Sequence, residues 1–228
     1  MPCPGNLPAV TPATAQPTLL RPLFDAYAER PEPRSVAVVG NMPMTPDAAR
    51  AKAIDDCDLV FRVNGFVLDE PTGPAVVGRH CHVVVLNWLI RATKWVFQDY
   101  QHRLYLMVEP GRLHFDGERV PGWWPADLGY IPVSNRDITL PLSDALGLPT
   151  RAEPTWATTG TMAAWIARTA FPDAELILTG FSFVDDPNQK SWMHAAGDSC
   201  VVGAEHKIDI EGRLLESWTR TSRTRLLR

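Results

Sequence analysis

Thr158-Thr159-Gly160-Thr161 directly precedes an apolar run of helical period and is the first candidate for chemistry. A threonine cap followed by a glycine is typical of a helix N-terminus, where backbone N–H groups have no partner inside the helix. Such N–H groups, together with the helix dipole, favour anions such as phosphate. A capped core helix without a ligand explains the same residues, so both interpretations stay open at this point.

Two histidines, His194 and His206, are the candidate acid–base residues. His206 precedes an apolar periodic segment that begins at Ile208, and the positive end of a helix dipole favours a neutral imidazole. Neutral imidazole is the form that a general base needs near pH 7. A histidine that only caps a surface helix is the alternative. His194 lies in a polar loop with glycine, so we expect an accessible ring.

Metal-type side chains occur in two other places. His80 and His82 could lie on one face of a strand, but no third ligand stands at a suitable spacing. Asp185-Asp186 is followed by Pro187-Asn188, which a turn explains as well as a cation site does. The four cysteines of the chain form no CxxC pair, which argues against zinc and for reduced thiols. We expect no metal.

Two apolar segments end in asparagine and would place these side chains at one edge of a sheet. Residues 35–41 end in Gly40-Asn41, and residues 58–64 end in Asn64. Parallel strands of an open sheet place their terminal residues around the ligand crevice. Asn41 could offer its amide to a phosphate or a nucleotide. It could equally be a turn residue.

The remaining pattern alternates strands with helices. Strands are predicted at 83–86, 103–108 and 176–178, and helices at 47–54, at 87–100, after Thr158 and after Lys207. This alternation predicts an α/β, Rossmann-like fold with a mostly parallel central sheet. We divide the chain into a flexible arm with a possible short helix (1–33), one α/β domain (34–219) and a solvated basic tail (220–228). Trp123-Trp124 could stack on a sugar or cover a core.

Composition limits the function. The chain has 228 residues and a net charge of −4, which gives no case for nucleic-acid binding. No apolar run approaches the roughly 20 residues that span a bilayer, and the N-terminus does not read as a secretory signal. We therefore expect a cytoplasmic protein, with peripheral contact to an anionic membrane through the C-terminal arginines as one option.

In order along the chain, the motifs VAVVGN, FRVN, TTGT, ILTGF and HKIDIE resemble the animal-type sialyltransferase family. The first two resemble its long motif, the TTGT segment and the strand after it the small motif, and His206 to Glu211 the very small motif. The resemblance spans about residues 35–211. Two features depart from the family: the third motif is replaced by Trp192-Met193-His194, and the cysteine pair that joins the long and small motifs is missing. The missing cysteines fit a bacterial-type protein.

The resemblance implies a modified glycosyltransferase A-type fold and an inverting, metal-independent enzyme. It implies a CMP-activated acidic sugar as donor substrate (sialic acid, Kdo or a related ulosonic acid), a glycan or glycolipid acceptor, polysaccharide biosynthesis as the setting, and no cofactor. His206 would be the base, and His194 would hydrogen-bond the leaving phosphate. The implied donor-nucleotide site consists of Gly40, Asn41, Asn64, Thr159, Gly160, Thr161 and Gly180.

Two rival functions remain. A Rossmann-like enzyme that uses another nucleotide would need a GxGxxG turn, which is missing, and a ribose-binding acid, for which Asp56 or Asp58 could serve. A binding protein that has lost turnover is the other rival. The presence of both histidines argues against it.

Overall fold

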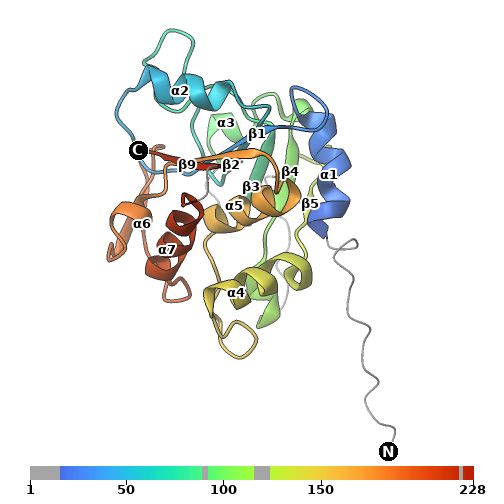
Figure 1. Cartoon of the computed structure of the whole chain (residues 1–228), viewed down its shortest axis with the longest axis vertical. Helices are drawn as coiled ribbons and strands as arrows, with labels where there is room; N and C mark the ends of the chain where they lie inside the picture. The colour runs from blue at the N-terminus through green and yellow to red at the C-terminus, as the bar shows by residue number, and fades with distance from the viewer. Residues whose placement is uncertain (1–15, 89–91, 116–123, 221–222) are drawn as a thin grey trace, which may run out of the picture.

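The computed structural model describes residues 16–88, 92–115, 124–220 and 223–228. Within these ranges one sheet of seven parallel strands has the order β5-β4-β3-β2-β1-β6-β9 (Figure 1). Its strands are β1 (Ser35–Val39), β2 (Leu59–Val63), β3 (Val83–Leu86), β4 (Leu104–Met107), β5 (Ile131–Pro132), β6 (Glu175–Thr179) and β9 (Thr224–Leu227). An antiparallel ribbon pairs β7 (Ser191–Met193) with β8 (Ser199–Val201). The prediction of an α/β fold with a mostly parallel sheet is confirmed.

Helices cover both faces of the sheet, which explains why β2 and β3 are buried at every residue. One face packs against α1 (Gln16–Tyr27), α4 (Leu140–Leu146), α5 (Thr159–Ala170) and α7 (Ile208–Trp218). The other face packs against α2 (Ala48–Asp55) and α3 (Lys94–Phe97). The short helix α6 (Ser182–Asp185) follows β6, and single turns occur at Tyr100–His102, Pro110–Leu113 and Asn135–Thr139.

The helix predicted over residues 87–100 is wrong in extent. Only α3 and the turn at Tyr100–His102 are helical there, while residues 89–91 lie outside the described ranges. The Trp88 amide donates to Glu109 Oε1 at 3.0 Å, and the Thr93 hydroxyl donates to the Phe66 carbonyl at 2.7 Å. These tertiary bonds replace the helical pattern that the apolar spacing suggested.

The N-terminal segment contributes to the core. Leu20 and Phe24 of α1 are buried in the main cluster, and Phe24 packs on Phe61 of β2 with ring centroids 5.5 Å apart. Residues 16–27 of the predicted flexible arm are therefore a packed helix, which is the short helix that the prediction allowed. The remainder of that prediction, residues 1–15, lies outside the described ranges.

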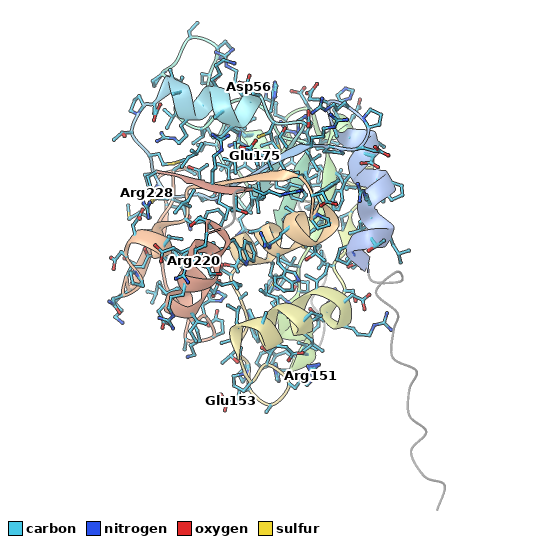
Figure 2. All side chains as sticks on the ribbon, viewed as in Figure 1. Asp56, Arg151, Glu153, Glu175, Arg220 and Arg228 are labelled. Atoms are coloured by element: carbon cyan, nitrogen blue, oxygen red, sulfur yellow. The ribbon has the colours of Figure 1, made fainter. Side chains whose placement is uncertain are left out.

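The predicted solvated tail is wrong for residues 224–227, which form β9 beside β6. Three arginines of the tail pair with carboxylates. Arg225 Nε lies 2.6 Å from Glu175 Oε1, and Arg228 Nε lies 2.7 Å from Asp185 Oδ1. Figure 2 labels Glu175 and Arg228. Arg223 contacts Asp173 in the same way. The segment is an edge strand with neutralised charges. No helix in the described ranges is long and apolar enough to cross a membrane.

Candidate functional site

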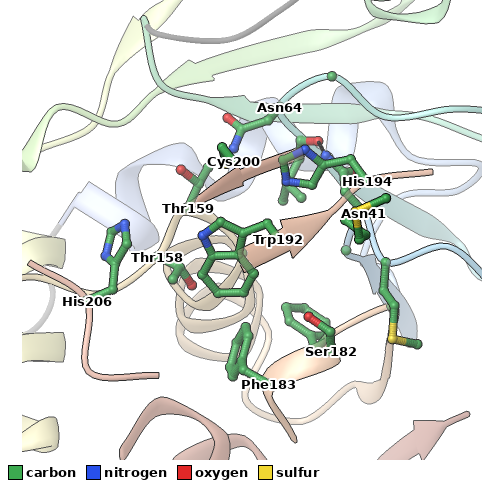
Figure 3. A pocket seen from close by; sticks show the side chains of 18 of the residues that line it. Asn41, Asn64, Thr158, Thr159, Ser182, Phe183, Trp192, His194, Cys200 and His206 are labelled. Carbon is green, nitrogen blue, oxygen red and sulfur yellow. Dashed lines mark hydrogen bonds between the residues drawn. The ribbon is translucent and has the colours of Figure 1, made fainter. Parts of the chain in front are cut away.

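A cavity of about 350 Å³ opens at the carboxyl ends of β1, β2, β3 and β6. The chain runs from β1 outward on one side and returns to β6 on the other, so the cavity lies at the switch point where α/β folds bind ligands. Eight of the nine residues predicted for the site line it, namely Gly40, Asn41, Asn64, Thr159, Gly160, Gly180, His194 and His206 (Figure 3). Thr161 does not.

Gly40 and Gly180 let β1 and β6 end in close contact. A Cβ on Gly40 would lie 2.2 Å from the Gly180 carbonyl oxygen. Gly180 has φ +77°, a conformation that L side chains rarely adopt. The close approach of the two strand ends therefore requires both glycines, and both line the cavity.

Asparagines follow three adjacent strands at this edge. The Asn41 Nδ2 donates to the Val63 carbonyl at 2.9 Å, which joins the ends of β1 and β2. Asn64 has φ +47°, and its Oδ1 accepts from the Asn87 amide at 3.2 Å, which joins β2 to β3. The Asn87 Nδ2 donates to the Thr159 hydroxyl at 3.1 Å. Each amide is oriented by a neighbour before any ligand arrives.

Asn87 also lines the cavity, although it was not among the site residues predicted from the sequence. The signal was present, because Asn87 directly follows a predicted strand at 83–86, just as Asn41 and Asn64 follow theirs. The helix predicted from residue 87 onward concealed it.

The first turn of α5 presents backbone N–H groups to the cavity. Thr158 caps the helix, and its hydroxyl accepts from the Thr161 amide at 3.3 Å. The amides of Thr159 and Gly160 make no hydrogen bond to another described residue. Both residues line the cavity, so this turn can receive an anion.

The predicted ligand contact of Thr161 is wrong. Its side chain is fully buried, and its hydroxyl donates to Glu211 Oε2 at 2.6 Å. The same oxygen accepts from the Thr158 amide at 2.9 Å and from the Thr158 hydroxyl at 2.7 Å. Burial raises the pKa of the Glu211 carboxyl, and the hydrogen bonds from both threonines and the nearby His206 oppose that shift. Thr161 thus stabilises the N-terminus of α5 through Glu211 and does not line the cavity.

His206 lies two residues before the first residue of α7, and its ring is held by a hydrogen bond. Its Nδ1 is 3.0 Å from the carbonyl oxygen of Trp156, which can only accept a hydrogen bond. Nδ1 therefore carries the proton in the neutral ring, and Nε2 is the basic nitrogen. Nε2 lies 3.7 Å from Glu205 Oε1, close enough for attraction once the ring is protonated.

His194 lies across the cavity, on the turn between β7 and β8 (Figure 3). Its Nδ1 is 2.9 Å from Asp198 Oδ2, and its amide donates to the Asp198 carbonyl at 2.9 Å. The Ala195 amide donates to the Asn41 carbonyl at 2.7 Å, so this turn is attached to the end of β1. Asp198 and Glu205 were not foreseen, since loop residues carry no periodic signal.

An aromatic wall stands beside the two histidines. Trp192 of β7 packs edge-on against Phe183 with ring centroids 5.9 Å apart, and Phe183 packs in the same way against Phe181. All three residues line the cavity. Such a wall can stack against a nucleobase or the apolar face of a sugar.

The other candidate groups have structural roles. His82 Nδ1 accepts from the Val60 amide at 2.9 Å, and its Nε2 is 3.1 Å from Glu29 Oε1. Asp186 accepts from the Asn188 amide within a turn. Among the described residues, no group of three or more His, Cys, Asp or Glu side chains could hold a metal ion.

Trp124 and the rival ribose acids, Asp56 and Asp58, do not line the cavity. Trp124 packs edge-on against Tyr105 in the core on the α3 face, while Trp123 lies outside the described ranges. Asp58 precedes β2, at the opposite end of the strand from the cavity, and binds the amides of Arg34 and Ser35. Asp56 pairs with Lys52.

Comparison with known proteins places the fold. Neither a protein-family model nor a curated protein matches the sequence. The structure is similar to the crystal structure of a mammalian sialyltransferase, with a TM-score of 0.57 and 18% identity over 85% of this chain and 68% of that one. A mammalian sialyltransferase in complex with Gal-beta-1-3GalNAc-ortho-nitrophenol gives a TM-score of 0.59 and 18% identity over 96% of this chain and 75% of that one. The chain has a sialyltransferase-like fold.

Proposed function

We propose that this protein is a glycosyltransferase that moves an acidic sugar from a CMP-sugar to a glycan hydroxyl, without a metal and with inversion. The observation that carries the proposal is the convergence of the α5 N-terminus, three oriented asparagines and two histidines in one cavity of a sialyltransferase-like fold. The donor sugar belongs to the class of sialic acid, Kdo and related ulosonic acids.

Donor binding would use groups that already point into the cavity. The amides of Thr159 and Gly160 and the side-chain amides of Asn41 and Asn64 surround the place where strands β1 and β2 end. Such fixed donors stabilise the negative charge that develops on the CMP phosphate as it leaves. The aromatic wall of Trp192 and Phe183 offers a surface for the base or the sugar ring.

His206 would be the general base. Its Nε2 removes the proton from the acceptor hydroxyl, and the oxygen attacks the anomeric carbon while the bond from that carbon to the phosphate oxygen breaks. CMP leaves from the face opposite the attack, which inverts the configuration. The Trp156 carbonyl accepts from His206 Nδ1, so Nε2 is the nitrogen that is free to act as the base. Glu205 would stabilise the imidazolium that forms.

The nucleotide preference tests the proposal first. We expect calorimetry with EDTA present to show that CMP binds more tightly than UMP, GDP or NAD. Preference for a different nucleotide would overturn the CMP-sugar assignment. Screening CMP-sialic acid beside CMP-Kdo with glycan acceptors would then identify the sugar.

Replacement of the base separates catalysis from binding. His206→Ala should lower the transfer rate by about 10²–10⁴-fold because general-base catalysis is lost. Its affinity for CMP should stay near that of the wild type. Transfer at the wild-type rate would show that His206 is not the base, and wild-type protein that binds CMP but transfers no sugar would point to a binding protein.

A further inference from the structure

The charges around the cavity are unusual for an anion site. Among the described lining residues there is no lysine and no arginine. Two carboxylates, Asp198 and Glu205, line the same space and repel an anion. The proposed donor carries a negative phosphate and a negative sugar carboxylate. The helix N-terminus supplies only about half of a positive charge, so a positively charged side chain beside the fixed amides would strengthen donor binding.

Of the two lining histidines, His206 must be neutral to act as the proposed base, so protonated His194 is the group that we assign to this charge. Its Nδ1 lies 2.9 Å from Asp198 Oδ2, and both side chains are about one quarter exposed. A carboxylate at hydrogen-bond distance stabilises the imidazolium over the neutral ring. When Nδ1–H donates to Asp198, a protonated Nε2 can donate to a bound anion. A single added proton thus lets the His194 ring donate one hydrogen bond to Asp198 and another to the bound phosphate.

The backbone holds this pair at the donor site. The Gly197 amide donates to the His194 carbonyl at 2.9 Å, and Gly197 has φ +87°, so the turn that joins the two side chains is tight. The Ala195 amide donates to the Asn41 carbonyl, which anchors the turn beside the end of β1. Among the lining residues that the structure describes, the other titratable groups are Cys200, Glu205 and His206.

We propose that Asp198 is a positioning residue that holds His194 for protonation, and that binding of the donor phosphate takes up a proton at His194. The proposal extends the proposed function, since the anion in question is the phosphate of CMP. Asp198 itself does not touch the donor. It acts through the imidazole, by orienting Nδ1 and by offsetting the charge that the ring gains.

Proton uptake can be measured directly. CMP binding would be followed by calorimetry from pH 5.5 to 8.5 in two buffers that differ in ionisation enthalpy, with cytidine as the matched ligand without a phosphate. We expect uptake of up to one proton with CMP, and a Kd that rises by up to about tenfold per pH unit in the alkaline range. Cytidine affinity should not depend on pH.

Variants assign the proton to the pair. Asp198→Asn should reduce the proton uptake and move the alkaline loss of CMP affinity to lower pH, and Asp198→Glu should restore part of both. His194→Gln should remove the uptake, and its residual pH dependence measures the ionisation of the phosphate itself, whose second pKa is about 6. His206→Gln should keep the uptake, which excludes the other lining histidine as its source.

Two outcomes overturn the inference, and a third concerns the function. A wild-type pH profile equal to that of His194→Gln would show that no proton is taken up at His194. An Asp198→Asn profile equal to that of the wild type would show that Asp198 has no part in it. Either result leaves the proposed function intact as long as CMP is preferred over UMP, whereas failure of wild-type protein to bind CMP overturns the proposed function itself.

Discussion

Glu211 joins α7 to the first turn of α5, and its removal should loosen the anion-binding end of that helix. Its Oε2 accepts three hydrogen bonds, from the amide and hydroxyl of Thr158 and from the hydroxyl of Thr161, at 2.9, 2.7 and 2.6 Å. The side chain is fully buried. We predict that Glu211→Ala lowers the free energy of unfolding by about 3 kcal/mol and weakens CMP binding, because Thr158 loses the partner that holds the cap.

The magnitude follows from opposing terms. Each hydrogen bond to a charged group contributes about 1.5–3 kcal/mol, and an unpaired buried amide costs about 1–3 kcal/mol. Desolvation of the carboxylate opposes these gains, as the raised pKa of Glu211 indicates, so the net loss is smaller than that of three full bonds. A carboxyl whose pKa is raised on folding contributes its full stability below its unfolded pKa of about 4.3. That contribution declines as pH rises through the folded pKa, so Glu211→Ala should cost more at pH 5 than at pH 8.

Urea unfolding at both pH values measures these changes, and Thr161→Val is the matched variant. It removes one hydroxyl from the same oxygen at nearly constant volume, and should cost about 1.5 kcal/mol. Each kcal/mol corresponds to a loss of about 2–4 °C in Tm for a chain of this size. The reasoning is refuted if Glu211→Ala costs no more than Thr161→Val, or if its cost grows with pH.

Two further predictions concern the carboxyl edge of the sheet, at Gly40, and its opposite edge, at His82. Gly40→Ala should lower the free energy of unfolding by about 2–3 kcal/mol, because the new Cβ would overlap the Gly180 carbonyl, whereas a Cβ at Gly129 would meet nothing within 4 Å. Gly129→Ala is the matched control, and equal urea midpoints for Gly40→Ala and Gly129→Ala would contradict this prediction. Burial lowers the pKa of His82, opposed by Glu29, so the stability from this residue is complete above its unfolded pKa of about 6.5 and is lost as pH falls. The free energy of unfolding should therefore fall more between pH 7.5 and pH 5.5 in the wild type than in His82→Gln. An equal fall in both proteins would contradict this prediction.

Most of the central sheet could be predicted because its signals are local. Apolar runs such as the segments of β1 and β3 end at glycine or asparagine, and Asp47 and Thr158 cap the helices α2 and α5 with their own side chains. Strand β9 gives no such signal. From the sequence it looks like part of a basic tail, because Arg225 and the flanking Arg223 and Arg228 pair with carboxylates about 40–50 residues away in sequence.

The site could be predicted where topology alone decides it. Asn41 and Asn64 follow from the rule that parallel strands end around the ligand, and Asn87 obeys the same rule. The error at Thr161 has a different origin, since the direction of its hydroxyl is decided by Glu211, which is 50 residues away in sequence. Asp198 was missed for a related reason: only the turn between β7 and β8 brings it to His194.

The two halves of the cavity differ in how they are built. The anion-facing amides belong to strand ends and to the α5 cap, which neighbouring strands and Glu211 fix in place. The titratable groups belong to the segment from His194 to His206, outside the parallel sheet. Fixed dipoles cost no reorganisation when charge develops, whereas histidines respond to pH and to their carboxylate neighbours. In the proposed reaction, nucleotide preference would therefore be a property of the sheet edge, and the pH dependence of turnover a property of this one segment.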